Sequence, residues 1–308
     1  MRLLLAASLF VACGLPAEPV TAEDPLDLDA EQQALAVPSE DRPETVDVGS
    51  WNVEWYGDPV NGPSPEWRQQ TNVERVVKQL DLDLLGLVEV VSPDAFAELL
   101  ARLPDHAGVL SVDPAFYAAG EQKLALVYRR RFTVEASKLI LTQQSWAFAG
   151  RPPLEVHLRF TEDGRPRTLV VIVAHFKAMA NQDGWSRRRT AATALKTYLD
   201  ATYPTRWVLV VGDLNDDLDT STYRGHESPF AELAQSPDYH FTTDALTRAG
   251  VATTVEYPNT IDHHLATNEL AARYIDGSAH VVKLEPYVRQ YGTTTSDHYP
   301  VVTRYDLR

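Results

Sequence analysis

The stretch Val208–Asp217, VLVVGDLNDD, joins an apolar run to a cluster of acidic and amide side chains. Four apolar residues, three of them β-branched, end at Gly212, and this pattern predicts a buried strand that enters a turn. Asp213 and Asn215 are two residues apart, so in an extended chain their side chains point the same way and can bind one cation or phosphate. An Asp/Asn/Gly turn that only closes a strand fits the same residues. The rest of the chain decides between them.

Length and composition are those of an ordinary globular protein. The 308 residues are 44% hydrophobic and 23% charged, enough for a substantial core. Cys13 is the single cysteine, which excludes zinc–thiolate sites and cysteine nucleophiles from the body of the protein. The formal charge of −15 argues against a static nucleic-acid binder. It does not argue against an enzyme that binds nucleic acid transiently, because divalent cations can offset a local acidic site.

The N-terminal segment predicts export. Residues 1–12, MRLLLAASLFVA, have one positive charge followed by an apolar run too short to span a bilayer, as in a signal peptide. The run resembles a bacterial lipoprotein signal, in which Cys13 becomes the lipidated first residue; simple cleavage and secretion is the alternative. Residues 13–45 are rich in Ala, Pro, Glu and Asp and predict a disordered acidic tether to the membrane. One domain is expected over residues 46–308.

Three further predicted strands end in a polar side chain: Val46–Val53 with Asn52, Leu84–Val88 with Glu89, and Thr168–Ala174 with His175. Glu89 has apolar neighbours on both sides, so we expect a cation or metal to accompany it. A histidine at such a position is more often structural than functional. Two later segments repeat the pattern: Asp262 lies in a strand expected over Thr260–Ala266, and Asp297 and His298 precede the terminal strand Val301–Tyr305.

The remaining periodic segments predict helices and strands around these. Helices are expected over Trp67–Leu80, from Ser92 to Leu103, over Trp185–Tyr203 and over Pro229–Gln235. Leu154–Phe160 and Thr168–Ala174 predict a hairpin, and Lys123–Tyr128 and Phe132–Leu141 predict two neighbouring strands. Arg187–Arg189 oppose the dipole at the start of their helix, so we expect a solvated charged face or a contact with an acid or phosphate.

Nearly every predicted core strand therefore delivers an acid, an amide or an imidazole at one end, and turns alone do not explain this repetition. The chain resembles the endonuclease/exonuclease/phosphatase superfamily of DNase I-like enzymes. The matching segments are WNVEWYGD at 51–58, LLGLVEV at 84–90, KLALVYR at 123–129, AHFKA at 174–178, VVGDLND at 210–216, TIDHHL at 260–265 and TSDHYPV at 295–301. The resemblance implies an α/β fold, a four-layered αββα sandwich of two mixed β-sheets flanked by helices.

The resemblance also implies roles for the site residues. Glu89 is the main metal ligand, with Asn52 and Asp297 nearby, and Asp213 and Asn215 orient the nucleophilic water or contact the phosphate. Oxygen ligands without thiols suit Mg²⁺, Mn²⁺ or Ca²⁺.

Two histidines complete the expected set. His298 pairs with Asp262, which favours its charged form, and His175 contacts the scissile phosphate. Which histidine acts as the acid stays open. In DNase-type enzymes a glutamate supports the equivalent of His175; the nearby candidates here are Glu121 and Gln122.

The resemblance favours an extracellular endonuclease that has little preference for the sequence of its substrate and acts on DNA or RNA. Arg187, Arg188 and Lys177 are candidates for contacts with the phosphate backbone, and no Cys-Asp-Arg element of the inositol phosphatases is present. A phospholipid diesterase or phosphatase of the same superfamily is the first alternative, and an inactive surface binding protein is the second. No obligate protein partner is evident. We expect Asp216, Asp217 and Asp219 to be solvated loop acids.

Overall fold

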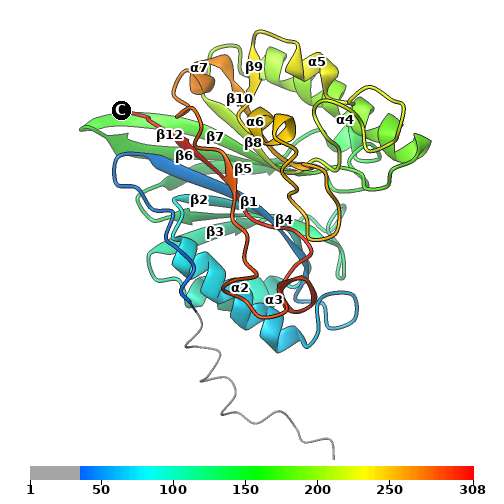
Figure 1. The fold of residues 1–308 in the computed structure, drawn as a ribbon. Helices are drawn as coiled ribbons and strands as arrows, with labels where there is room; N and C mark the ends of the chain where they lie inside the picture. The colour runs from blue at the N-terminus through cyan, green and yellow to red at the C-terminus, as the bar shows by residue number, and fades with distance from the viewer. Residues whose placement is uncertain (1–34) are drawn as a thin grey trace, which may run out of the picture. The chain divides into compact units, whose positions relative to one another are not determined.

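The computed structural model describes residues 35–308, which form two six-stranded mixed β-sheets with helices on their outer faces (Figure 1). The first sheet has the order β11-β12-β1-β2-β4-β3, with β1 (Val46–Tyr56), β2 (Leu84–Val90), β3 (His106–Leu110), β4 (Lys123–Arg129), β11 (His280–Val281) and β12 (Val301–Tyr305). The second has the order β5-β6-β7-β8-β10-β9, with β5 (Thr133–Leu139), β6 (Leu154–Glu162), β7 (Arg165–His175), β8 (Val208–Asp213), β9 (Tyr239–Phe241) and β10 (Asp262–Thr267).

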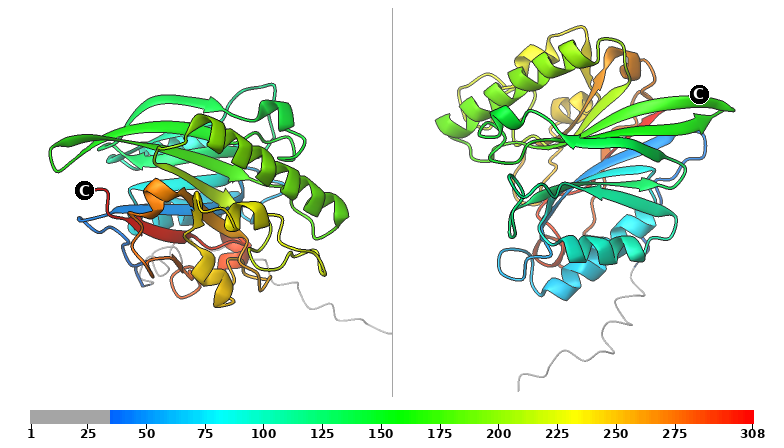
Figure 2. Two further views of the ribbon diagram at one scale, coloured as in Figure 1. Left: turned by 90° about the horizontal axis from the view of Figure 1, so that it is seen from above. Right: turned by 180° about the vertical axis from the view of Figure 1, so that it is seen from behind.

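The helices lie on the two outer faces. They are α2 (Glu66–Leu80), α3 (Pro93–Ala101), α4 (Gln182–Thr202), α5 (Ala231–Ala234), α6 (Asp244–Arg248), α7 (Asn268–Ala271) and α8 (Tyr291–Thr294), with a 3-10 turn, η1, at Thr142–Gln144. Figure 2 shows α2 and α3 against the first sheet and α4 across the second. None of the described helices is long and apolar enough to cross a membrane.

Three hydrophobic clusters hold these layers together. One packs α2 and α3 onto the first sheet, one packs α4 and α5 onto the second, and the third fills the space between the sheets. The layers follow the order helix, sheet, sheet, helix. This is the four-layered sandwich that the sequence predicts, so the fold prediction is confirmed. Because neighbouring residues of a strand point to opposite faces, each central strand serves two clusters at once.

Strand β8 shows how this alternation places a functional residue. Leu209 and Val211 belong to the cluster between the sheets, so Asp213, two residues further on, points toward the same space. Gly212 has φ +139°, and a Cβ there would lie 2.0 Å from the Ala174 carbonyl oxygen. Only glycine therefore lets β7 and β8 pair this closely beside the site.

The domain begins earlier than the sequence predicted. Cys13 and the predicted signal lie outside the described residues, but residues 35–45, assigned to the tether, pack against the domain. Val37 is buried in the cluster beneath α2, and the Glu40 N–H donates to the Leu80 carbonyl at 2.8 Å. The folded unit therefore begins at Leu35 and includes a segment whose composition predicts disorder, so it extends beyond the boundary predicted at residue 46.

A second correction concerns the strands on either side of Arg129–Arg131, which were expected to be neighbours. β4 lies in the first sheet between β2 and β3, whereas β5 is the edge strand of the second sheet beside β6. The three arginines form the crossover between the sheets. Arg131 binds the buried Asp83 carboxylate, which fixes this crossover to the body of the domain.

Candidate active site

A cavity of about 620 Å³ opens where the functional ends of the central strands meet. Of the eight residues singled out from strand ends, seven line it: Asn52, Glu89, His175, Asp213, Asn215, Asp297 and His298. Asp262, the eighth, lies directly behind His298. Residues from β1, β2, β7, β8 and the turn before β12 thus converge from both sheets, and the structure brings together the whole predicted set.

Glu89 reaches the cavity through a local break in β2. Its neighbour Val88 points into the space between the sheets, so regular alternation would turn Glu89 toward α2 and α3. Instead Glu89 has φ +67°, and the pairing of β2 with β4 shifts register between Val88 and Val90. Such bulges re-aim single side chains. Burial raises the pKa of the Glu89 carboxyl, and the hydrogen bond from Asn52 partly offsets this rise.

Asn52 links the two central carboxylates. Its side-chain NH₂ donates to Glu89 Oε1 at 3.0 Å and to Asp213 Oδ2 at 3.1 Å, while its oxygen accepts the Glu54 N–H at 2.9 Å. This explains why a buried strand contains an asparagine, since every polar atom of the amide has a partner. In this arrangement Asn52 positions Glu89 and Asp213, and its oxygen is already engaged by the backbone.

His298 is held by two acids. Its Nδ1 lies 2.9 Å from Asp262 Oδ2, and its Nε2 lies 3.7 Å from Asp213 Oδ2. Burial alone would lower the pKa of His298, but the Asp262 and Asp213 carboxylates outweigh it and raise this pKa well above its ordinary value. The two carboxylates therefore favour the charged form of His298, which presents Nε2 to the cavity.

His175 has the opposite environment. Its Nε2 lies 3.5 Å from Asp213 Oδ2, but burial, reinforced by the nearby Arg151 guanidinium, lowers the pKa of His175 well below its ordinary value. Its buried Nδ1 has no hydrogen-bond partner among the described residues. Gln122 accepts a hydrogen bond from Arg151. The supporting carboxylate expected from the DNase-type enzymes is therefore absent from the described contacts of His175, and an arginine lies nearby instead.

Glu54 is an acid of the site that the sequence analysis did not select. Its Oε2 accepts the Asp297 N–H at 2.8 Å. Burial, with Asp297 next in effect, raises the pKa of the Glu54 carboxyl to about 7. The signal was present in the WNVE segment, because Glu54 lies two residues after Asn52 and so shares its face of a regular strand, although its φ of +46° departs from strand geometry.

The predicted substrate contacts at the start of α4 need correction. Arg188 is completely buried: its Nε lies 2.8 Å from the Asp216 carboxylate, and it cannot reach a bound substrate. Arg187 lies over the Trp146 ring and donates to the Trp146 carbonyl, and it is not among the cavity-lining residues. Lys177, also expected at the substrate, is likewise not a lining residue. Both arginines therefore stabilise the fold, because the groups that they contact belong to the domain itself.

The loop acids after β8 also differ from expectation, because two of the three are buried. Asp216 accepts hydrogen bonds from Arg188, from the Ser221 hydroxyl and from the Thr222 N–H. Asp217 accepts from the Thr247 hydroxyl at 2.8 Å and from the Thr260 N–H at 3.1 Å. Both organise the loops around the cavity, whereas Asp219 is exposed as predicted.

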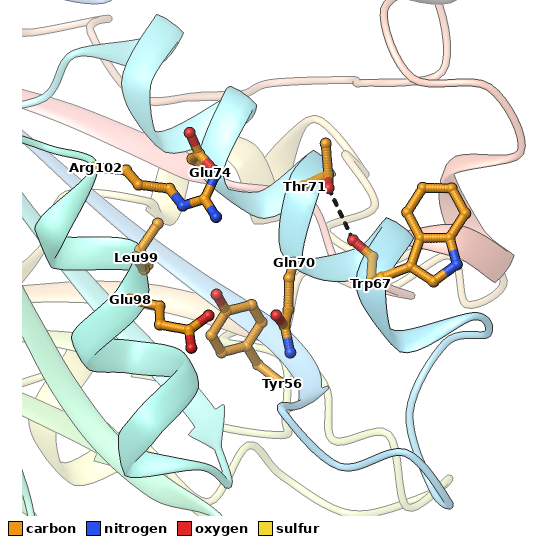
Figure 3. Close-up of a pocket in the computed structure, with 8 residues that line it drawn as sticks. All are labelled: Tyr56, Trp67, Gln70, Thr71, Glu74, Glu98, Leu99 and Arg102. Atoms are coloured by element: carbon orange, nitrogen blue, oxygen red, sulfur yellow. Dashed lines mark hydrogen bonds and ion pairs between the residues drawn. The ribbon is translucent and has the colours of Figure 1, made fainter. Parts of the chain in front are cut away.

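The cavity wall contains residues that no sequence pattern had marked. Met179, Thr222, Arg224, Tyr257 and Asn259 come from loops, where periodicity gives no signal. A separate hollow of about 160 Å³ between α2 and α3 shares no lining residue with the cavity (Figure 3). Its Glu74 and Arg102 pair at 3.3 Å, and its exposed Trp67 provides a comparison residue that does not line the cavity.

The donor set fits a hard divalent cation. Carboxylate, amide and imidazole atoms converge without any thiol, and ligand atoms of Asp213, Asp262 and His298 lie within 4.8 Å of one another. The pKa values of Glu54 and Glu89 are raised chiefly by burial, with like charges nearby as a further cause, an environment that a cation would relieve. Glu89, predicted as the main ligand, lies one hydrogen bond from Asn52, and Asp297 lies beside His298.

The chain belongs to the endonuclease/exonuclease/phosphatase family, whose model matches residues 49–298. The human Nocturnin catalytic domain with bound sulfate is 21% identical, with a TM-score of 0.58, over 89% of this chain and 97% of that one. A family protein from Bacteroides vulgatus is 17% identical, with a TM-score of 0.60, over 86% and 99%. D. rerio TDP2 complexed with a single-strand DNA product is 14% identical, with a TM-score of 0.61, over 85% and 98%. No curated protein sequence matches the chain.

Proposed function

We propose that this protein is a divalent-metal-dependent hydrolase of phosphodiester bonds, and that it acts as an endonuclease with little sequence preference. The observation that carries the proposal is the pair of histidines facing one central carboxylate. His175 Nε2 and His298 Nε2 lie 3.5 Å and 3.7 Å from Asp213 Oδ2, with Asp262 holding the far side of His298. A structural role does not require this arrangement, whereas phosphoryl transfer can use it, because it brings proton-accepting and anion-stabilising groups together at one point.

The proposed chemistry follows from the positions of these groups. A metal at Glu89, with Asn52 and Asp297 nearby, would shield the phosphate charge and stabilise the leaving oxygen. Asp213 is held in place by Asn52 and by the Asn215 N–H at 2.9 Å, and it accepts the proton of the attacking water.

The two histidines contact the phosphate oxygens in different charge states. His298, kept charged by Asp262 and Asp213, stabilises the anion that develops during attack. His175, kept neutral by burial and Arg151, donates a hydrogen bond from Nε2 if its proton lies there. His298 is therefore the better candidate for the group that protonates the leaving oxygen.

Nucleic acid is the proposed substrate for two reasons. The cavity wall combines an aromatic ring, Tyr257, with a cation, Arg224, and together these suit a nucleotide. A structure of D. rerio TDP2, a protein of similar fold, contains a single-strand DNA product. A phospholipid diesterase or phosphatase is the second candidate, because a family model that spans endonucleases, exonucleases and phosphatases does not separate them.

A substrate panel tests the proposal. The purified protein is incubated with plasmid DNA, RNA, sphingomyelin and inositol phosphates, each with Mg²⁺, Mn²⁺ or Ca²⁺ and each with EDTA. We expect nicking of DNA that EDTA abolishes and that His298→Ala removes while folding persists. Hydrolysis of sphingomyelin alone would favour the second candidate. Absence of any metal-dependent hydrolysis would leave an inactive surface binding protein as the remaining interpretation.

We also propose export with a lipid anchor at Cys13, on the grounds of the Met1–Cys13 sequence alone. Expression in a bacterium with and without Cys13→Ala tests this. The wild type is expected in the membrane fraction and the variant in the soluble fraction. Equal distribution of the two forms would contradict lipidation.

A further inference from the structure

Two large apolar side chains project into solvent at the mouth of the cavity. Met179 and Tyr257 are each 63% exposed, and both line the cavity. Met179 follows β7 and Tyr257 precedes β10, and these two strands flank β8 in the sheet. The two side chains therefore come from loops on either side of the end of β8 that presents Asp213. Single exposed apolar side chains are ordinary, so it is the position of both on the wall of one cavity that calls for a reason.

The loop that presents Met179 is fixed from beneath. The carbonyl oxygens of Lys177 and Met179 accept hydrogen bonds from Arg188 Nη1 at 2.8 Å and 3.0 Å. Met179 has φ +85°, which a non-glycine residue adopts only when its surroundings hold it there. A Cβ on Gly184 would lie 2.2 Å from the Met179 carbonyl, so the loop lies directly on the first turn of α4. Arg188, itself buried, is thus a positioning residue for the cavity mouth.

The loop that presents Tyr257 is fixed to the catalytic turn. Thr254 forms a backbone bridge with His298, and the Val255 N–H donates to the Asp297 carbonyl at 2.8 Å. The Thr254 hydroxyl accepts from the Tyr257 N–H and donates to the Tyr257 carbonyl, both at 3.0 Å. The tyrosine backbone is therefore coupled to the Asp297–His298 turn, while its ring remains outside the packed loop.

One cation accompanies these two side chains. Arg224 is exposed, and among the described residues that line the cavity it is the only arginine or lysine. Its loop is held by Asp216, which accepts from the Ser221 hydroxyl at 2.8 Å and from the Thr222 N–H at 2.6 Å. The wall of an otherwise acidic cavity thus combines an aromatic ring, a thioether and a positive charge.

We infer that Met179, Tyr257 and Arg224 form a nucleotide clamp beside the catalytic acids. In this clamp Tyr257 and Met179 hold the face of a nucleobase next to the scissile phosphate, and Arg224 contacts the adjacent phosphate. In a nucleotide chain, a flat base lies one linkage away from the next phosphate, which matches an aromatic ring beside a cation. A lipid fits less well, because its apolar part is long and carries no second phosphodiester. Since only an unpaired base offers its face for stacking, the clamp adds a preference for single-stranded nucleic acid or frayed ends to the proposed cleavage of duplex DNA. The inference rests on the proposed phosphodiesterase function.

A pair of matched substrates tests the clamp. One is a single-stranded oligothymidylate, and the other is the same backbone with abasic residues. We expect wild-type protein to prefer the base-bearing substrate by roughly tenfold in kcat/KM, the scale of one stacked base. Tyr257→Ala should remove this preference by raising KM for the base-bearing substrate, with the abasic substrate unaffected. Tyr257→Phe should keep the preference. Arg224→Gln should reduce the slope of oligonucleotide affinity against salt concentration by about one phosphate contact.

Two controls keep the outcome decisive. Trp67→Ala removes an exposed aromatic side chain from the separate hollow in Figure 3 and should change neither substrate. Anisotropy of the labelled oligonucleotide in EDTA measures binding without turnover, so the clamp is tested even if no substrate is cleaved. Equal binding of wild type and Tyr257→Ala would overturn the clamp while leaving the proposed function intact. Loss of sphingomyelin binding in Tyr257→Ala, with oligonucleotide binding unchanged, would also overturn it in favour of a lipid.

Discussion

His298 Nδ1 lies 2.9 Å from Asp262 Oδ2, although the two residues are 36 positions apart in the sequence and lie at the ends of strands from different sheets. Asp262 begins β10 of the second sheet, and His298 lies in the turn before β12 of the first. This one hydrogen bond therefore joins the two halves of the sandwich at the cavity. It also determines which imidazole nitrogen faces the cavity, because the other is engaged.

Replacing Asp262 with asparagine should keep the fold and remove most of the activity. The amide is the same size but carries no charge, so it no longer favours the charged imidazole. We expect kcat to fall about 10²- to 10⁴-fold, measured on plasmid DNA with unchanged circular dichroism. Asp219→Asn, a change in an exposed loop acid, is the control. Wild-type turnover in Asp262→Asn would exclude this pair from the mechanism.

Replacing Glu89 with glutamine should weaken metal binding. Glu89 lines the cavity and accepts a hydrogen bond from Asn52, and it is the proposed main ligand, so its replacement removes a charged oxygen ligand. Mn²⁺ affinity, measured by electron paramagnetic resonance, should fall about 10- to 100-fold. In EDTA the same variant should melt at a higher temperature than wild type. Glutamine removes a carboxyl whose ionised form is disfavoured by burial, as the raised pKa of Glu89 indicates.

Glu98→Gln, in the hollow between α2 and α3, provides the matched control for that experiment. It changes the same functional group outside the cavity and should leave Mn²⁺ binding as it is. Unchanged Mn²⁺ affinity in Glu89→Gln would show that the ion binds elsewhere, with Asp213, Asp262 and His298 as the next group to replace.

Neighbouring arginines of α4 should differ sharply in their effect on stability. Arg188→Ala leaves the buried Asp216 carboxylate without its ion-pair partner and should lower the free energy of unfolding by about 3–5 kcal/mol. Arg187→Ala loses a bond to a carbonyl and a contact with Trp146 near the surface, and should cost about 1 kcal/mol or less. Urea unfolding at neutral pH measures both. Similar losses in the two variants would contradict the distinction.

Acid should destabilise the protein through its buried histidines. Both ring nitrogens of His264 form hydrogen bonds, one with the Ser50 hydroxyl and the other with the Thr303 hydroxyl. Burial lowers the pKa of His264 to about 3. The unfolded chain, with an ordinary pKa near 6.5, therefore binds a proton that the folded protein excludes. The contribution of neutral His264 to the free energy of unfolding is fully present above pH 6.5 and is lost as pH falls toward 3. Between pH 6.5 and 5 the loss from His264 is about 2 kcal/mol.

Urea unfolding at pH 7 and pH 5 measures this loss. His264→Gln cannot take up a proton in this range, so its stability should depend less on pH than that of the wild type. His240→Gln, at an exposed position of β9, should keep the wild-type dependence. An equally steep pH dependence in His264→Gln would assign the acid sensitivity to other groups.

The sequence predicted the central strands and their polar ends well because both signals are local. Apolar alternation identified β1, β2, β7, β8 and β12, and the residue at the end of each strand was visible beside it. The short strands β3, β9 and β11 were missed, since a few residues carry too little periodicity. The partners of each strand were less predictable: β4 and β5 are close in sequence, yet they belong to different sheets.

The stretch VLVVGDLNDD illustrates the division between sequence and tertiary structure. Its residues by themselves predicted a buried strand that enters a turn at Gly212, followed by an acid and an amide able to bind one ligand, because these signals are local. Only the tertiary structure decided which acids face the cavity. Asp213 faces the cavity, Asp216 and Asp217 support the surrounding loops, and Glu89 enters through a bulge. Those outcomes depend on partners tens of residues away, whose positions no local pattern contains.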